Sequence, residues 1–555
     1  MPTRTNKSFH LIGSIALILA LGLGSCQKGD LLSNPNAASE STSIPVSLLL
    51  NHITWSIYRG GGVVDANMSS SANDIDGATG AVIESPWNAA MKLNQFYLSN
   101  NQYYQGLNTY SWSNTATAYD ILKYTVLLEK QAATQYPSAP TTNVYAALGK
   151  FFRAYQFVWL TQRVGDIPVT QAGNPANLTP AYNSQHDAYK TSLALLDTAN
   201  TYLGNLVTAT NKNTVVDAGD IFGLTYLQWQ KVVNTYKLRV LISLSKRAVD
   251  NADLNIPQQF AAIVADATKY PVMTGNADNI VFKYNSINTY PTANTNYNNL
   301  ANIGQTYLNI TTANHDPRTF AVATPAPAQL TAGKSYTDFD AYVGGDPSLS
   351  LTTLTSNNSA GMYSNPNYNR YVTSTTGANA EPAIVIGYPE LCFNIAEAIN
   401  RGWIASAGGS NSEAWYLNGI NASLSTYGIT DGKVLTVGDA AGKAYGNVTV
   451  NLADFLTNAN VVYKGDNNDG LTQILTQKYV AFFQNSGWEA FYNYRRTGVP
   501  AFAQGAATGT ANNLIPRRWE YPQGELNYNS ANCKAAISSQ FGGTDDVSKD
   551  TWLTK

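Results

Sequence analysis

The sequence has 555 residues, of which 44% are hydrophobic and 13% are charged. The charged share is about half of the usual value of about 25%, which excludes a long coiled coil held by ion pairs. The apolar share excludes a wholly disordered chain. With 34 basic and 36 acidic residues, the net charge of −2 offers no basic surface, so no nucleic acid partner is expected. Tyrosine (35) outnumbers phenylalanine (17) and tryptophan (10) together, which indicates a neutral, hydrogen-bonding surface.

Residues 1–25 are predicted to be a signal peptide. Arg4 and Lys7 precede an apolar run of 13 residues, Leu11–Leu23, and this is shorter than the roughly 20 residues that cross a membrane. The run ends in Leu23-Gly24-Ser25-Cys26, which resembles the lipobox of bacterial lipoproteins. The resemblance implies that Cys26 is lipidated and that its acyl chains anchor the protein to a membrane. The alternative is an ordinary signal peptide in which Cys26 occurs by chance.

Residues 26–43 are predicted to be the lipidated cysteine and a flexible tether, because Ser, Asn and small residues dominate the stretch. Its opening, Gln27-Lys28-Gly29-Asp30, loosely resembles the signal of surface-exposed Bacteroidetes lipoproteins, with Gly29 in place of an acid. The remaining cysteines, Cys392 and Cys533, lie in unlike contexts, so a disulfide between them stays open. Cys392 falls in an apolar-periodic stretch and is predicted to be a small core residue.

The body, residues 44–555, is predicted to be one mainly α-helical domain. Helical spacing of apolar residues, or length between breakers, predicts seven helices. They cover Ala118–Gln135, 144–158, His186–Leu206, 229–244, 388–398, Glu413–Tyr427 and 471–482. Consecutive helices of this length indicate stacked, tetratricopeptide-like pairs, in arrays at about 118–250 and 384–496, although no clean 34-residue repeat is visible.

Between the two arrays, the region at about 251–383 is predicted to be a loop-rich insertion. Tyr284–Asn302 and Ser356–Ala380 are dense in Asn, Tyr, Thr, Gly and Pro and show little helical period. Long irregular stretches in a globular chain often form binding loops or covers.

Short motifs follow one another in a characteristic order. The earlier ones are Arg163–Pro168, Leu238–Val240, Asp316–Arg318, Tyr388–Glu390, Ala396–Ala398 and Arg401-Gly402. The later ones are Gln477–Tyr479, Gly487–Ala490, Arg495–Gly498, Ile515–Arg518 and Tyr521-Pro522. Together with the lipobox, this ordered set resembles the SusD/RagB family of nutrient-binding outer-membrane lipoproteins, most closely the SusD-like type 2 variant.

The resemblance implies a SusD-like fold of four tetratricopeptide-like helical pairs whose loops form the ligand face. It also implies a lipid-anchored outer-membrane protein that faces the cell exterior. Such a protein binds a glycan or another oligomeric nutrient and delivers it to a SusC-like TonB-dependent barrel, its expected partner.

The motif residues also have physical interpretations. Gly165 is predicted to end a helix with a positive φ, and Asp316 to open a turn. Trp488 and Phe491 are predicted core residues. The charged residues of the motifs are predicted to form internal ion pairs that tie helix ends together, with ligand contact as the alternative; they are Glu390, Glu397, Arg495-Arg496 and Arg517-Arg518.

Neutral sugars present hydroxyl groups and apolar C–H faces, which proteins bind with aromatic rings and polar side chains. Residues of these types interleave in three predicted loop clusters, and each cluster is a candidate binding site. The clusters are Tyr103, Tyr104, Asn108, Tyr110 and Trp112; Tyr290 and Tyr297; and Tyr363, Tyr368, Arg370 and Tyr371. The alternative for each is packing of a loop onto the body.

No catalytic motif is present, and the protein is predicted not to be an enzyme. His52, His186 and His315 are scattered, and no GxSxG elbow occurs. A glycosidase stays open, because paired carboxylates need only be neighbours in space. A second alternative is a helical-repeat adaptor that binds only protein.

The oxygen-rich stretch Gly465–Gly470 is predicted to be a solvated turn before the helix at Leu471, because its spacing does not fit an EF-hand loop. No cofactor is expected, with a structural calcium ion here as the alternative.

Overall fold

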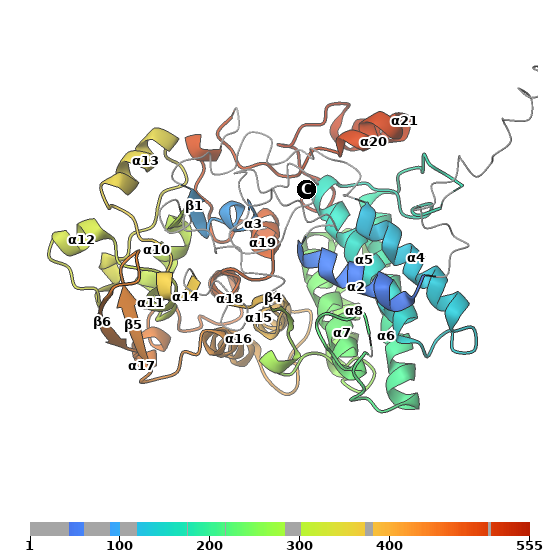
Figure 1. Ribbon diagram of the computed structural model, residues 1–555, viewed down its shortest axis with the longest axis horizontal. Coiled ribbons are helices and arrows are strands. Elements are labelled where there is room, and N and C mark those ends of the chain that lie inside the picture. Colours follow the sequence, from blue (N-terminus) through green and yellow to red (C-terminus); the bar gives the residue numbers. More distant parts are fainter. Residues whose placement is uncertain are drawn as a thin grey trace, which may run out of the picture. The chain divides into compact units, whose positions relative to one another are not determined.

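The computed structural model describes residues 44–59, 89–99, 119–174, 176–216, 218–283, 301–371, 381–508 and 512–555. Contacts divide the chain into two units, Met1–Pro45 and Val46–Lys555. All helices and strands described below belong to the second unit (Figure 1). This unit is mainly α-helical, which confirms the predicted fold class, and its strands are short.

A first group of helices stacks in chain order. The group consists of α2 (Val46–Arg59), α4 (Asp120–Gln135), α5 (Val144–Val164), α6 (Gln185–Ala209), α7 (Tyr226–Ser243) and α8 (Ile256–Ala265). α4 packs on α5, α5 on α6, α6 on α7 and α7 on α8, while α2 lies against α4 and α5 (Figure 1). The four helices predicted in this region correspond to α4–α7, and their order gives the stacked hairpins that the sequence indicates.

Local side chains set the ends of these helices. The Asn143 side chain accepts hydrogen bonds from the backbone N–H groups of Tyr145 and Ala146 in the first turn of α5, and Thr225 with Gln228 forms a capping box at α7. α5 ends at Gly165, whose φ of 94° confirms the predicted positive-φ position. The helix limits are therefore set by signals within a few residues of each end.

A second group contains α15 (Tyr388–Asn400), α16 (Ser412–Thr426), α18 (Asn468–Ala481) and α19 (Glu489–Thr497). α15 packs against both α16 and α18, and it also contacts α7. In Figure 1, α15, α16 and α18 lie between the first group and the elements of residues 301–371. Contacts of α7 with α15 and α19 thus join the two helical groups.

The region between the groups holds more helix than its sequence indicates. It contains α10 (Gln305–Ala313), α11 (Arg318–Val322), α12 (Pro327–Thr331), α13 (Leu351–Ser359) and α14 (Tyr368–Tyr371). None of these exceeds nine residues, and helices this short complete too few turns to show a period. The prediction of little helical structure across Ser356–Ala380 was wrong for 356–359 and 368–371; residues 284–300 and 372–380 lie outside the described residues.

Strands in the described residues form antiparallel pairs. β1 (Tyr97–Ser99) pairs with β3 (Ala301–Ile303), β2 (Ile280–Phe282) with β4 (Ala383–Ile386), and β5 (Val434–Gly438) with β6 (Ala444–Thr449). The first two pairs join segments that are far apart in the sequence. β5 and β6 form a hairpin beside α17 (Leu452–Leu456) and α11 (Figure 1).

The core is rich in aromatic rings. Trp488 and Phe491 are buried and pack at right angles against Trp519, which confirms that both are core residues. Cys392 and Cys533 are both buried and free, so they are not joined by a disulfide. Burial raises the pKa of the Cys392 thiol to about 12, as befits a small core residue.

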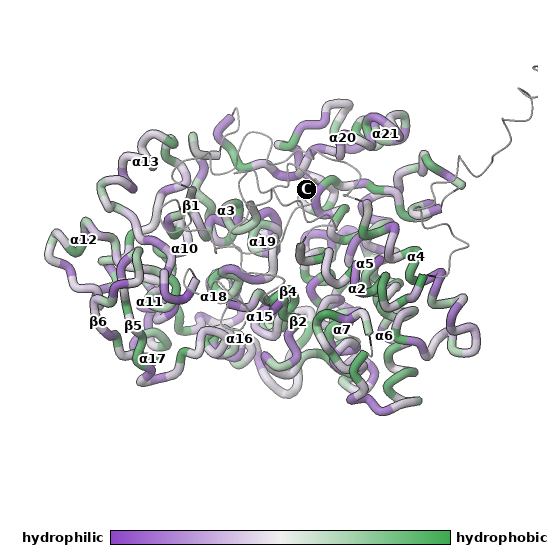
Figure 2. The backbone as a smooth tube through the Cα atoms, in the orientation of Figure 1, coloured by the Kyte–Doolittle hydropathy of each residue, from purple (hydrophilic) through white to green (hydrophobic). Residues whose placement is uncertain are grey.

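Hydropathy changes along every helix rather than staying high. Figure 2 shows hydrophobic and hydrophilic residues alternating along the helices of both groups. Within the described ranges, we find no helix with both the length and the apolar content needed to cross a bilayer.

Candidate functional site

The charged motif residues lie in the interior, where they bind one another. Arg239 of α7 donates from Nε to Glu390 Oε1 of α15 at 2.8 Å, and both side chains are nearly inaccessible. Asp316 and Arg318 form a second pair at 2.6 Å, in which both side chains are fully buried. Arg318 also donates to Gln477 Oε1 of α18 at 2.7 Å. The Arg239–Glu390 pair connects α7 with α15, which confirms the structural interpretation of Glu390, and the bond to Gln477 connects α11 with α18.

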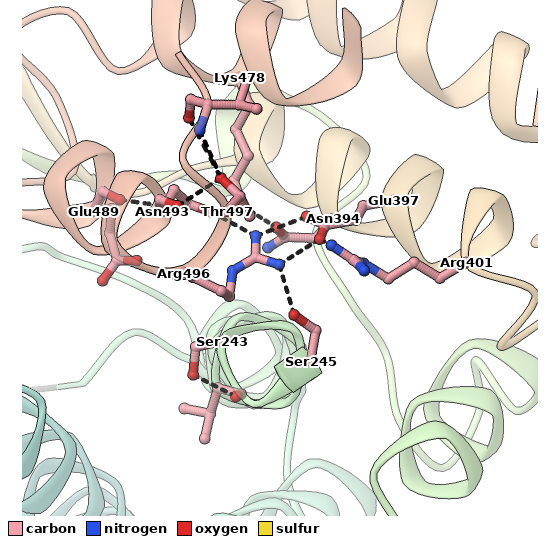
Figure 3. A network of polar contacts seen from close by, with 12 residues as sticks. Ser243, Ser245, Asn394, Glu397, Arg401, Lys478, Glu489, Asn493, Arg496 and Thr497 are labelled. Carbon is pink, nitrogen blue, oxygen red and sulfur yellow. Dashed lines mark hydrogen bonds and ion pairs between the residues drawn. The ribbon is translucent and has the colours of Figure 1, made fainter. Parts of the chain in front are cut away.

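Glu397 of α15 occupies the centre of a third network (Figure 3). It accepts hydrogen bonds from Arg496 Nη2 of α19 at 2.9 Å and from Arg401 Nε at 2.8 Å. Burial alone would raise the pKa of Glu397, but the charges of Arg496 and Arg401 outweigh burial and lower the pKa to about 2. Lys478 lies close by and donates to Asn394 Oδ1 at 2.6 Å; burial lowers its pKa to about 8.

Three of the four arginines in the two motif arginine pairs form ion pairs, and Arg495 binds main-chain oxygens. Arg496 binds Glu397, Arg517 binds Asp550 at 2.9 Å, and Arg518 binds Asp545 at 2.6 Å. Arg495 instead donates to the main-chain oxygens of Arg517 and Gln162 and lies over aromatic rings. The prediction of ion pairs was therefore wrong for Arg495, and burial is the first cause that lowers the pKa of this arginine, to about 10.

Two of the three predicted ligand clusters fall outside the described residues. They are Tyr103, Tyr104, Asn108, Tyr110 and Trp112, and Tyr290 and Tyr297. Their role in binding stays a prediction.

The third cluster divides into buried and accessible residues. Tyr363 is 6% exposed and packs with Leu98 and Leu354, and its hydroxyl accepts a hydrogen bond from Asn357 at 2.7 Å. Tyr371 is 1% exposed and lies near Phe483. A ligand at the surface cannot reach rings in such positions. The structure thus places Tyr363 and Tyr371 in packing roles, which was the alternative for this cluster.

Tyr368 and Arg370 remain half-buried at the surface. Arg370 binds Glu381 at 2.6 Å and lies over the ring of Tyr427, 4.8 Å from its centroid. Its charge is therefore already engaged within the protein. Tyr368 packs beside Gly442 in the turn of the β5–β6 hairpin, where a Cβ would come within 2.5 Å of the ring. The neighbouring Asn369 donates to the Gly442 main-chain oxygen at 3.2 Å.

The hairpin presents a second aromatic feature that the sequence analysis did not single out. The rings of Tyr336 and Tyr445 are nearly parallel, at 15°, with centroids 6.4 Å apart. Tyr445 is 41% exposed. The Tyr336 side chain packs on Gly446, where an added Cβ would clash with the Tyr336 hydroxyl. Partial burial and the nearby Asp439 raise the pKa of Tyr445, so its phenol stays a neutral hydrogen-bond donor. We call Tyr336, Tyr368, Asn369 and Tyr445 the hairpin surface.

This surface combines the groups that bind neutral sugars. Flat rings can cover C–H faces, and the phenol and amide groups can donate to or accept from hydroxyls. Thr436 donates to Asn447 at 3.0 Å on the same hairpin. A tyrosine beside a glycine outside the predicted helices, as in Tyr445-Gly446, was the signal that could have identified this surface.

A separate groove of about 360 Å³ lies among α6, α7 and α8. Its two lysines are each matched by an acid: Lys190 binds Asp253 at 3.0 Å, and Lys237 binds Asp197 at 2.5 Å. Tyr270 lines the groove as well. With its charges paired, the groove carries no evident preference for a charged ligand.

The stretch Gly465–Gly470 leads into α18, as predicted, but the helix begins three residues earlier than expected, at Asn468, so only 465–467 precede it. The Asn467 side chain accepts hydrogen bonds from the backbone N–H groups of Asp469 and Gly470, and Asp466 accepts one from the Tyr463 hydroxyl at 2.8 Å. Across the part of the chain that the structure describes, no three His, Cys, Asp or Glu side chains gather in a way that could hold a metal ion.

A family model for SusD-like proteins of type 2, described as starch-binding and associating with the outer membrane, matches residues 69–522. The chain belongs to this family. A SusD homologue from Bacteroides fragilis is 27% identical over 92% of this chain and 100% of that chain, with a TM-score of 0.74. A Bacteroides vulgatus protein, described as a candidate outer-membrane protein for nutrient binding, is 28% identical over the same shares, with a TM-score of 0.69.

The SusD-like fold also extends to more distant proteins. A chitin-binding protein shares the fold at 19% identity and a TM-score of 0.65, over 92% of this chain and all of that chain. No curated protein matches this chain. The resemblance to SusD-like proteins and the helical fold that it implies are thus confirmed, and the family is one associated with the outer membrane.

Proposed function

We propose that this protein is a non-catalytic outer-membrane lipoprotein that binds a glycan and delivers it to a SusC-like TonB-dependent transporter. The observation that carries the proposal is the match of residues 69–522 to a family described as starch-binding and associated with the outer membrane. Lipidation of Cys26 would provide the anchor, and Cys26 lies outside the described residues.

The hairpin surface supports binding of a neutral sugar. Tyr336 and Tyr445 provide two nearly parallel rings, of which Tyr445 is well exposed. A neutral sugar gains from such rings through contact and hydrogen bonding rather than through charge. The stretch with Tyr104 and Trp112, which is predicted to be a loop and lies outside the described residues, is a second proposed contact region.

The binding test is calorimetric titration of the purified protein with starch- and chitin-derived oligosaccharides. Loss of one aromatic contact of about 1 kcal/mol weakens binding about fivefold, so Tyr445→Ala should raise Kd about fivefold or more. Tyr528→Ala is the matched control, since Tyr528 is 80% exposed on α20 (Gln523–Tyr528), outside the hairpin surface. Tyr104→Ala and Trp112→Ala test the second region.

The alternatives give different results. An adaptor that binds only protein shows no heat with any oligosaccharide, and a glycosidase releases shortened products on prolonged incubation. Purification from outer membranes tests the partner, because the proposal expects a large barrel protein to copurify. Kd values equal to that of the parent for Tyr445→Ala, Tyr104→Ala and Trp112→Ala would refute both proposed binding regions.

A further inference from the structure

A pocket of about 330 Å³ lies apart from the hairpin surface, where four elements meet. It is bordered by the 3₁₀ turn Ser245–Arg247 after α7, the end of α15, the first turns of α18 and the end of α19. Ligand pockets usually measure about 300–1,000 Å³, so this one suits a molecule of about one sugar ring.

The lining of this pocket is strongly basic. It includes Lys246, Arg401 and Arg496, and neither aspartate nor glutamate is among the lining residues in the described part of the chain. This contrasts with the net charge of −2 for the whole chain and with the α6–α8 groove, where each lysine meets an acid. Glu397 lies behind the lining and is shared between Arg401 and Arg496.

Two of the cations keep hydrogen-bond donors to spare. Lys246 donates from Nζ to the main-chain oxygen of Thr554 at 2.7 Å, and an ammonium group has three N–H donors. Within the described ranges, Arg401 bonds through Nε to Glu397 at 2.8 Å, which leaves its two Nη nitrogens as donors. These nitrogens form the planar fork that matches a carboxylate or sulfate.

The positive charges at the pocket repel one another. Burial is the first cause that lowers the pKa of Lys246, and the nearby Arg517, Arg247 and Arg496 lower it further, while Asp550 opposes them. A bound anion would relieve this repulsion.

The rest of the pocket is shaped and held in place. Leu471, Leu475 and Val499 provide apolar contact area, and Thr472 also lines the pocket. Within the lining, Arg496 Nη1 donates to Ser245 Oγ at 2.8 Å, so the turn after α7 is bonded to α19 (Figure 3). The cations are therefore carried by a 3₁₀ turn and by helix ends that are bonded to one another.

We propose that this pocket binds a molecule of monosaccharide size that carries an oxyanion group, such as the carboxylate of a uronic acid or a sugar sulfate. The anion lies between Lys246 and the Nη nitrogens of Arg401, and the sugar ring contacts the apolar lining residues Leu471, Leu475 and Val499. This inference does not depend on the proposed transport function or on the hairpin surface.

The test is titration of the purified full chain with sodium galacturonate, glucose 6-sulfate and galactose at low ionic strength. We expect binding of at least one of the two anions, weakening with added salt, and no binding of galactose. Lys246→Gln should raise Kd about tenfold or more, because it removes a hydrogen bond to a charged group. Thr472→Glu should have a similar effect by placing a carboxylate at the edge of the pocket.

Matched controls keep the outcome clear. Lys190→Gln removes a lysine that is paired with Asp253 in the other groove and should leave Kd unchanged. Melting temperatures equal to that of the parent would show that Lys246→Gln and Thr472→Glu are folded. Absence of binding for both anions, equal binding of galactose, or unchanged affinity in the folded Lys246→Gln variant would each overturn the proposal. Tyr445→Ala should retain anion binding, which separates this site from the proposed glycan site.

Discussion

Replacing Glu397 by glutamine removes the acid that Arg496 and Arg401 share inside the protein. The pKa of Glu397 is about 2, against an ordinary value of 4.5. At 1.36 kcal/mol for each pKa unit, the folded state gains about 3 kcal/mol from the ionised carboxylate at neutral pH. Loss of one partner from a buried ion pair costs about 3–5 kcal/mol, in agreement with this value.

The expected change in melting temperature follows from the size of the unit. Unfolding entropy is about 2.1 cal/mol/K per residue, so for the roughly 510 residues of Val46–Lys555 a change of 1 kcal/mol shifts the melting temperature by about 1 °C. Glu397→Gln should therefore melt about 3–5 °C below the parent at pH 7, as measured by calorimetry. Glu413→Gln, which removes an exposed carboxylate at the start of α16, is the control and should melt within about 1 °C of the parent.

The pH dependence gives an independent check. Because the folded-state pKa of Glu397 is lowered, its contribution is present above the ordinary pKa of 4.5 and is lost as the pH falls toward 2. Between pH 7 and pH 3 the Glu397 carboxylate should lose about 2 kcal/mol of its contribution to the free energy of unfolding. The melting temperatures of parent and variant should then differ by only about 1–2 °C at pH 3. Equal melting temperatures of variant and parent at pH 7 would refute the conclusion that this carboxylate is ionised and paired. A difference in melting temperature that stays constant from pH 7 to pH 3 would refute it as well.

Three further predictions concern other parts of the chain. Gly165→Ala should destabilise the protein by about 1–3 kcal/mol, because φ is 94° and the added Cβ would lie 2.1 Å from Gln540 Oε1; Gly498→Ala, at φ 73° with open space around it, should cost less in the same thermal melts. Trp488→Ala should cost about 3–5 kcal/mol, since Trp488 is 1% exposed and packs on Trp519, and a melting temperature equal to the parent's would contradict its core role. Cys26→Ser should abolish incorporation of radiolabelled palmitate in cells, and labelling of the variant at the parent's level would exclude Cys26 as the lipidation site.

Much of the helical framework could be predicted from the sequence. The apolar spacing of 144–158 and 388–398 predicted α5 and α15, because one face of each helix must be buried whatever it packs against. The short helices of 301–371 were missed because four to nine residues complete too few helical turns for a periodic apolar pattern to be recognised. Their positions follow from contacts with β1, the β5–β6 hairpin and α18.

The chain by itself determined the long helices, the helix end at Gly165 and the family, because each depends on residues close together in sequence or on an ordered set of motifs. Tertiary structure decided which tyrosines are available to a ligand: Tyr363 and Tyr371 are buried, while Tyr336 and Tyr445 come together from distant segments. It also decided which charges are paired, since Arg239 meets Glu390 in the interior, while Lys246 lines a pocket whose lining holds no acid in the described residues. Exposure and charge pairing depend on neighbours brought together by folding, and local sequence does not record those neighbours.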